Sequence, residues 1–324
     1  MFKTQYHTAE PMRIDKFLTH FLPDVSRQYV QELIIQEIVF KNGIIVKKPK
    51  EMVSLGDIVE VDIAAVKQYT GDSISQDRKQ ELRDQVKIIY EHHDFLIIDK
   101  PAGLLMHKTN NPQSYSLVDI IKELYPEIEG VKDKNQSREA QMQQRDGIVH
   151  RIDKDTSGLV IIARNQEAFE LLKHLFQDRE VYKEYICLVR GHIRQTHDHI
   201  TYPIIRSKLD HTKRVAVVSD KQSKSHERHA DTEYWVQKIY DKASLLKVVI
   251  HTGRTHQIRV HMKAIGHPII GDKLYGGKVE AQDNQTLSRQ FLHAARLQFN
   301  YREKQYTFDS KLPRELQNYV DALS

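Results

Sequence analysis

The sequence contains only one cysteine, and several other features that define common protein classes are missing. Cys187 cannot form an internal disulfide or a cysteine-based zinc cluster on its own. Its apolar surroundings in YICLVRG predict a buried and inert thiol. No apolar run approaches the roughly 20 residues of a membrane helix, and the N-terminal residues lack the apolar core of a signal peptide. We therefore expect a cytoplasmic protein that does not contact a membrane.

A strong excess of charge is also missing. The net charge of +5 and the pI near 8.9 are mild, so they permit an acidic partner such as RNA without requiring one. No internal repeat, low-complexity tract or glycine-rich phosphate loop is visible. The chain of 324 residues can bury a large core, and its composition is that of a globular protein.

The first unit predicted by the pattern covers residues 1–66. Two segments with helical spacing, RIDKFLTHFL and SRQYVQELIIQ, are followed by short strand-like pieces. Ser26 is the expected N-cap of the second helix, and Asn42-Gly43 is a strong hairpin signal. The unit is not basic overall. Its basic residues gather at the helix starts and in one run, which suits contacts with RNA phosphates, although an ordinary solvated surface is an equal alternative: Arg13, Lys16, Arg27, Lys47, Lys48.

Residues 67–85 are polar and lack apolar periodicity, and we interpret them as a linker. Residues 86–324 form the predicted second domain, in which strands and helices alternate and many strands follow one another directly. The fold class is therefore α+β with a mixed sheet, not a doubly wound nucleotide-binding fold. Two polar excursions, residues 127–144 and 207–229, interrupt this domain. The second is basic and is a candidate RNA-binding loop, with a solvated loop as the alternative.

A charged loop stands directly before an apolar strand in HRIDKDTSGLVIIAR, His150 to Arg164. From the residues alone, Asp153 and Asp155 are an acid/base pair, a metal pair, a nucleophile with a bystander, or plain turn residues. Thr156-Ser157-Gly158 lets the chain turn tightly into the strand, and we expect its hydroxyls to hold the loop by local hydrogen bonds. Loops delivered by rigid strands are usual places for chemistry.

The second chemical cluster is HTGRTHQIRVHMKAIGHPIIGDKLYG, His251 to Gly276. Arg259 lies between two apolar residues, so it is a candidate inward-facing partner for a buried carboxylate, with a surface salt bridge as the alternative. The histidines at 251, 256, 261 and 267 are spaced by 5, 5 and 6 residues, which suits no standard helical ligand pair. We therefore expect no metal site.

Four segments in this order carry a resemblance: IIDKPAGLLMH, HRIDKDTSGLVIIAR, YKEYICLVRG and the second chemical cluster. They resemble the motif series of the RluA family of pseudouridine synthases over essentially Val86 to Leu312. Residues 12–62 resemble the ribosomal S-four-type RNA-binding domain, except that this domain usually has glycine where the chain has Glu37. The resemblance implies a pseudouridine synthase fold, with a mixed, largely antiparallel central sheet and helices, plus a small N-terminal α/β RNA-binding domain.

The resemblance also implies roles for individual residues. Asp153 matches the family's catalytic aspartate, and Asp155 is then a variable neighbour. Tyr185 matches the active-site tyrosine near the flipped uracil, although a core strand aromatic is the alternative reading of the residue itself. Arg259 matches the arginine paired with the aspartate. Arg151 matches a motif residue expected to help hold the region of the flipped nucleotide. Arg254 of the second chemical cluster is a further candidate RNA-binding residue.

The implied activity is isomerisation of specific uridines to pseudouridine by base flipping, cleavage of the glycosidic bond and re-attachment at carbon 5. No cofactor is expected. The appended RNA-binding module favours large-subunit ribosomal RNA, or a pre-ribosomal particle, as partner over transfer RNA. We expect a monomer. The alternative is an RNA-binding ribosome-assembly factor in which catalysis is secondary or lost.

Overall fold

The computed structural model describes residues 2–21, 27–62, 76–108, 114–134, 146–207, 210, 212–218, 228–276 and 287–323, without the side chains of residues 27–29, 32, 76 and 78. Two compact units are formed, one mainly by the residues up to Glu81 and the other mainly by the residues from Leu82 onward. Within the segment expected to be a linker, the first part lies outside the described residues and the second forms helix α4 (Gln76–Gln85).

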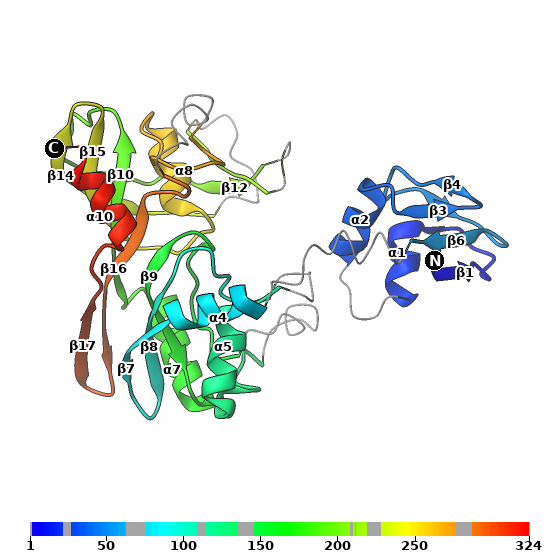
Figure 1. Cartoon of the computed structure of the whole chain (residues 1–324), viewed down its shortest axis with the longest axis horizontal. Helices are drawn as coiled ribbons and strands as arrows, with labels where there is room; N and C mark the ends of the chain where they lie inside the picture. The colour runs from blue at the N-terminus through cyan, green and yellow to red at the C-terminus, as the bar shows by residue number, and fades with distance from the viewer. Residues whose placement is uncertain are drawn as a thin grey trace. The chain divides into compact units, whose positions relative to one another are not determined.

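The first unit consists of two helices and short strands, as the pattern predicts (Figure 1). Its helices are α1 (Ile14–Phe21) and α2 (Arg27–Ile35). A sheet in the order β1-β6-β3-β4 and a pair β2-β5 are built from β1 (Phe2–Gln5), β2 (Met12–Arg13), β3 (Val39–Lys41), β4 (Ile44–Ile45), β5 (Met52–Val53) and β6 (Ile58–Val61). The apolar faces of both helices supply the core, since Leu18, Leu33 and Ile34 are fully buried. The expected cap, Ser26, lies outside the described residues.

Two turns of the first unit place the backbone in the left-handed region. Asn42 and Gly43 have φ of 50° and 78° between β3 and β4, which is the geometry of the predicted two-residue hairpin. Glu37 has φ of 60° directly after α2, and the amide of Ile38 donates to the carbonyl of Leu33. A glycine would adopt this conformation without strain. The turn geometry is therefore retained although glutamate occupies the position.

The second unit is organised around a 9-stranded sheet in the described residues (Figure 1). The strand order is β11-β14-β15-β10-β16-β9-β8-β7, and β17 also pairs with β16. Every pairing is antiparallel except that of β16 with β9, so the expected mixed, largely antiparallel sheet is confirmed. The strands are β7 (Lys87–Glu91), β8 (Phe95–Lys100), β9 (Ser157–Ala163), β10 (Tyr182–Arg190), β11 (His197–Ile200), β14 (Thr232–Tyr240), β15 (Ala243–Ile250), β16 (Leu292–Tyr301) and β17 (Lys304–Asp309).

Helices and a small hairpin surround this sheet: α5 (Leu117–Leu124), the 3-10 turn η1 (Pro126–Ile128), α7 (Gln166–Gln177), α8 (Gln257–Ala264), α10 (Arg314–Asp321), β12 (Ile204–Arg206) and β13 (Arg214–Ala216). Asn165 caps α7, because its side-chain oxygen accepts a hydrogen bond from the amide of Ala168 at 2.9 Å. Among the described helices, none combines the length and apolar character needed to cross a bilayer.

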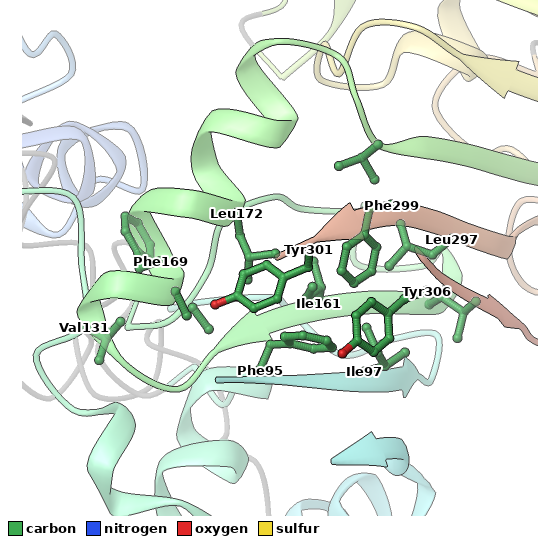
Figure 2. Packing of buried hydrophobic residues seen from close by; sticks show 14 residues of the cluster. Phe95, Ile97, Val131, Ile161, Phe169, Leu172, Leu297, Phe299, Tyr301 and Tyr306 are labelled. Atoms are coloured by element: carbon green, nitrogen blue, oxygen red, sulfur yellow. The ribbon is translucent and has the colours of Figure 1, made fainter. Parts of the chain in front are cut away.

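A buried cluster between α7 and the sheet makes β9 rigid. Figure 2 shows Phe169 and Leu172 of α7 facing Ile161 of β9 and the aromatic rings of Phe95 and Phe299. All seven residues of β9 are buried, as its apolar run predicts. Truncating a buried leucine such as the one in α7 typically costs 2–5 kcal/mol. The loop that precedes β9 is thus attached to one of the firmest parts of the unit.

The start of β9 is fixed by contacts with distant residues. Gly158 has φ of 116°, and a Cβ placed there would lie 2.2 Å from the carbonyl oxygen of Ala294 on the parallel neighbour β16. The Ser157 hydroxyl lies 3.0 Å from Nδ1 of His293, and the Thr156 hydroxyl accepts from Gln290. The expectation of local hydroxyl bonds was wrong, because the partners of both hydroxyls are distant in sequence: Gln290 directly precedes β16, and His293 lies at its start.

Candidate active site

A pocket of about 80 Å³ forms where the loop before β9, strand β10 and the start of α8 meet. Its wall consists of residues 151–153 and 156, Tyr185, residues 250 and 253–259, and Leu292. Five of the residues singled out from the sequence line it together: Asp153, Tyr185, Arg259, Arg151, Arg254. Asp155 is not among the lining residues. The structure therefore distinguishes the two aspartates, which the residues alone left equivalent.

Arg259 connects two carboxylates at the base of this pocket. Its NH1 donates to Oδ2 of Asp153 at 3.0 Å, while Nε and NH2 donate to the two oxygens of Asp272 at 2.7 and 2.9 Å. The Asp272 side chain is fully buried, and 18% of the Asp153 side chain is exposed. The buried arginine therefore holds Asp153 in place while leaving it accessible from the pocket.

The environment keeps this arginine charged. Burial alone would lower its pKa, but the hydrogen bonds and charge of Asp272, followed by those of Asp153, raise the pKa of Arg259 above its usual range. Asp272 is itself held by the backbone amides of Leu274 and Tyr275, at 2.9 and 3.0 Å. The ring of Tyr275 covers the guanidinium at 5.1 Å. The Asp272 carboxylate thus accepts hydrogen bonds from the guanidinium and from two backbone amides.

Tyr185 forms another wall of the pocket from β10. Its backbone pairs with Val248 of β15 and Ala294 of β16, so the ring position is fixed by the centre of the sheet. The side chain is buried, and the pKa of its hydroxyl is raised by burial and by the charge of Asp153. The phenol is therefore protonated at neutral pH, and it lines the same pocket as Asp153.

A buried lysine, Lys100, holds the loop that carries Asp153. The Lys100 amine donates to the carbonyls of Pro101, Leu104 and Lys154 at 2.8, 2.9 and 3.0 Å. Burial lowers the pKa of Lys100 to about 7, and the charge of Asp155 acts in the opposite direction. Three carbonyl acceptors match the three hydrogens of an ammonium group. The lysine therefore fixes the backbone one residue after the aspartate.

Arginines gather beside the pocket. The pKa of Arg214 is lowered by burial and by the positive charges of Arg206, Arg151 and Arg228, which places these groups near one another. Nε of Arg254 donates to the carbonyl of His229 at 3.0 Å. The described part of the basic excursion thus contributes positive charge next to the pocket, whereas residues 208, 209, 211 and 219–227 lie outside the described residues. Such a rim suits phosphate groups.

Three residues of the site were missed by the sequence reasoning: Asp272, Tyr275 and His256. Nδ1 of His256 lies 2.8 Å from the hydroxyl of Tyr275, and burial lowers the pKa of His256. His256 has φ of 58° at the start of α8. All three lie inside the second chemical cluster, but their turn-like sequence context resembles that of ordinary loop residues. No signal in the sequence pointed to a second carboxylate, because the resemblance already paired Arg259 with Asp153.

The five basic residues predicted to bind RNA in the first unit are separate from this pocket in sequence. Lys16 and Lys48 are exposed. Arg13 is also exposed and forms a two-point pair with the buried Asp15 at 2.9 and 3.1 Å, and Lys47 lies 3.5 Å from Glu37. The side chain of Arg27 is outside the described part of the chain. Their RNA contacts stay a prediction.

Comparison with known proteins gives matches to both parts of the chain. Residues 94–264 match the family model described as RNA pseudouridylate synthase, and residues 12–59 match the S4 domain. An uncharacterized RNA pseudouridine synthase of Aquifex aeolicus (strain VF5) is 38% identical over 286 residues, covering 86% of this chain and 82% of the relative.

A ribosomal large subunit pseudouridine synthase D of Yersinia pestis is 33% identical over 325 residues, covering 96% of this chain and 90% of the relative. Among solved structures, human RNA pseudouridylate synthase domain containing 1 aligns with a TM-score of 0.56 and 25% identity, covering 74% of this chain and 95% of that chain. Both matches agree with the fold and with the segments that carried the resemblance in the sequence.

Proposed function

Because the chain belongs to the RNA pseudouridylate synthase family, whose members are isomerases, we propose that it converts specific uridines of large-subunit ribosomal RNA to pseudouridine. The N-terminal S4 domain and the relatives named as ribosomal large subunit synthases support this choice of RNA. The observation that carries the proposal is the half-buried Asp153 held by Arg259 in a pocket beside Tyr185.

The reaction needs a carboxylate at the sugar of the flipped nucleotide. The bond between ribose and uracil breaks, the uracil rotates, and carbon 5 bonds to the anomeric carbon while its proton leaves. A carboxylate can attack the anomeric carbon, as in retaining glycosidases, or remove a neighbouring ribose proton to give a glycal. Either route uses one ionised aspartate. Asp153 fits this role because Arg259 orients it and because its side chain is accessible.

Tyr185 is proposed to contact the uracil. A uridine in a stem has to leave its stack, with a penalty of a few kcal/mol. Stacking on an aromatic ring typically returns about 1–3 kcal/mol per base. The protonated hydroxyl of Tyr185 cannot remove the carbon 5 proton until it loses its own, so we assign the ring a binding role first. Removal of the proton by this phenol, in concert with a neighbouring base, is the secondary assignment.

RNA is proposed to reach the pocket across the arginines beside it. Arg151 and Arg254 line the pocket and would contact the backbone next to the flipped nucleotide. The basic side chains of the S4 domain would hold RNA further along, through phosphates. Replacing Arg151 by alanine should weaken RNA binding and reduce the slope of affinity against salt by about one phosphate contact.

The test is tritium release from large-subunit RNA labelled at carbon 5 of uridine. Wild type is expected to release tritium, and Asp153→Asn is expected to release none while still binding RNA. Asp155→Asn is the matched control. It removes the same charge two residues further along the chain, from a side chain that does not line the pocket. Turnover by a folded Asp153→Asn protein would refute the assignment. RNA binding without release by the wild type would favour the assembly-factor alternative.

A further inference from the structure

Three histidines and two carboxylates gather on neighbouring strands outside the pocket. This histidine cluster consists of His197 and His199 on β11, Asp231 and Glu233 at the start of β14, and His251 directly after β15. Two histidines two residues apart on one strand point to the same face. Glu233 is the cross-strand partner of His199, so the sheet register itself brings the imidazoles and the carboxylate together.

The three imidazoles converge on one carboxylate. Nε2 of His197 and Nε2 of His199 lie 2.7 and 3.1 Å from Oε1 of Glu233, and Nε2 of His251 lies 3.1 Å from Oε2. The Glu233 side chain is 16% exposed, while the histidine side chains are 41–48% exposed. The ligand atoms of His197, His199 and Glu233 all lie within 4.8 Å of one another, and those of His199, Asp231 and His251 form a second such group. Imidazole and carboxylate are ligands that zinc takes from proteins, so the first group has the donor types of a metal site.

The outer contacts of the cluster follow the same pattern. Nδ1 of His199, the ring nitrogen opposite the one aimed at Glu233, lies 3.4 Å from Oδ1 of Asp231. Metal-bound histidines usually donate this second N–H to a carboxylate, which fixes the tautomer and the ring orientation. The ring of His197 stacks on Trp235 at 4.8 Å and 9°. Two of the three imidazoles are therefore held in orientation before any ion arrives.

We propose that the histidine cluster binds one divalent transition-metal ion, with zinc as the expected metal, through His197, His199 and Glu233, with water completing the coordination. In tetrahedral coordination, with metal–ligand distances of about 2.0–2.1 Å, neighbouring ligand atoms are roughly 3.3 Å apart. The distances of 2.7 and 3.1 Å from the two Nε2 atoms to Oε1 of Glu233 need to open by only a few tenths of an ångström. Three protein ligands leave one coordination position of the ion open.

A second group of possible ligands, His92, His93 and Asp94, is less suitable. The Asp94 oxygens already accept hydrogen bonds from Asn165 and Tyr301 at 2.8 and 2.9 Å. The rings of His92 and Phe95 stack at 4.6 Å. An ion there would have to displace satisfied buried bonds. His93 lies 3.1 Å from Asp94, but this carboxylate already accepts from Asn165 and Tyr301. The group therefore serves as a matched control.

The position of the cluster indicates what the metal would stabilise. The Asp231 amide donates to the Thr252 hydroxyl at 2.9 Å, and the Asp231 carbonyl accepts from Nε2 of Gln257, also at 2.9 Å. Gln257 lines the pocket. An ion linking β11 and β14 would therefore fix the strand end from which the pocket wall continues. This inference does not depend on the proposed reaction.

The test is titration of the full-length protein, first stripped with a chelator, with Zn²⁺ alone, followed by calorimetry and by the thermal midpoint. Wild type and His93→Gln are expected to bind one equivalent with the same affinity and to gain thermal stability. His199→Gln and His197→Gln are expected to lose at least 10-fold in affinity, and Asp231→Asn 10–100-fold. Circular dichroism without zinc verifies that each variant is folded.

Co²⁺ provides a spectroscopic readout, because a four-coordinate site gives intense visible bands that an exposed single histidine does not. These bands should be present in wild type and absent in His199→Gln. The proposal is overturned if wild type and His199→Gln take up zinc equally. It is also overturned if His93→Gln is the only variant that no longer binds one Zn²⁺ tightly, because the ion then binds at the group of His92, His93 and Asp94.

Discussion

Replacing Asp272 by asparagine should destabilise the protein far more than the same change at Asp153. The reason is that the two carboxylates share the hydrogen bonds of Arg259 unequally. Asp272 is completely buried and receives two hydrogen bonds from the guanidinium, whereas Asp153 is partly exposed and receives one. The two variants remove one negative charge each from the same arginine, so they form a matched pair.

The magnitude follows from the contacts. Asparagine at position 272 can still accept from the two backbone amides through its oxygen, but its NH2 group then faces the Nε–H of Arg259 at the present 2.7 Å. One charge-assisted bond is lost, two donors confront each other, and a buried cation loses its fully buried counter-ion. Breaking a buried pair in this way costs about 3–5 kcal/mol. Asp153→Asn leaves Arg259 paired and should cost about 1 kcal/mol.

The assay is urea unfolding of both variants at pH 7, followed by circular dichroism. Asp309→Asn is the control, because Asp309 forms an exposed pair with Arg296 that should contribute less than about 1 kcal/mol. If Asp272→Asn unfolds at the same urea concentration as Asp153→Asn, the argument fails, and Arg259 is held by something other than the buried carboxylate.

Two further predictions concern the loop and strand that carry Asp153. Gly158→Ala should lower the free energy of unfolding by about 2–4 kcal/mol, since its Cβ would meet the Ala294 backbone at 2.2 Å; Gly130→Ala, also at positive φ but with nothing within 4 Å, should lose only about 1 kcal/mol in the same urea experiment. Burial lowers the pKa of His150 from 6.5 to about 3, so the unfolded chain binds more protons between these values and stability rises with pH across that window. Lowering the pH from 7 to 5 should therefore remove about 2 kcal/mol of unfolding free energy, and an unchanged pH slope in His150→Gln would contradict this assignment.

Local signals predicted local structure well. The Asn42-Gly43 hairpin depends on contacts within a few residues, and it is confirmed. The apolar run of β9 predicts a buried strand, and all seven residues of this strand are buried. The turn at Glu37 shows the limit of such signals, because a glutamate in the sequence does not predict a positive φ. Its conformation is imposed by the chain on either side, where α2 has to end and β3 has to begin.

The parts of the site that depend on long-range pairing could not be derived from the residues. Arg259 and Asp153 are 106 positions apart, and periodicity says nothing about that distance. A family resemblance supplied this pair, but Asp272 had no comparable signal. The histidine cluster was hidden for the same reason. In sequence His251 has histidines at 256, 261 and 267 as neighbours, whereas in the sheet it faces His199 and Glu233 on strands that precede it.

The division of charge around Arg259 explains how one aspartate can be both fixed and reactive. Two carboxylates and one guanidinium carry a net charge of −1. Asp272 is enclosed and accepts from Arg259 and two backbone amides, so its charge is compensated where no solvent reaches. The uncompensated share of negative charge therefore lies on Asp153, at the surface of the pocket. An arginine paired with Asp153 alone would neutralise it and weaken it as a nucleophile or base. Positive charge that develops at the anomeric carbon during bond cleavage would instead meet an oriented carboxylate whose charge the protein has left available.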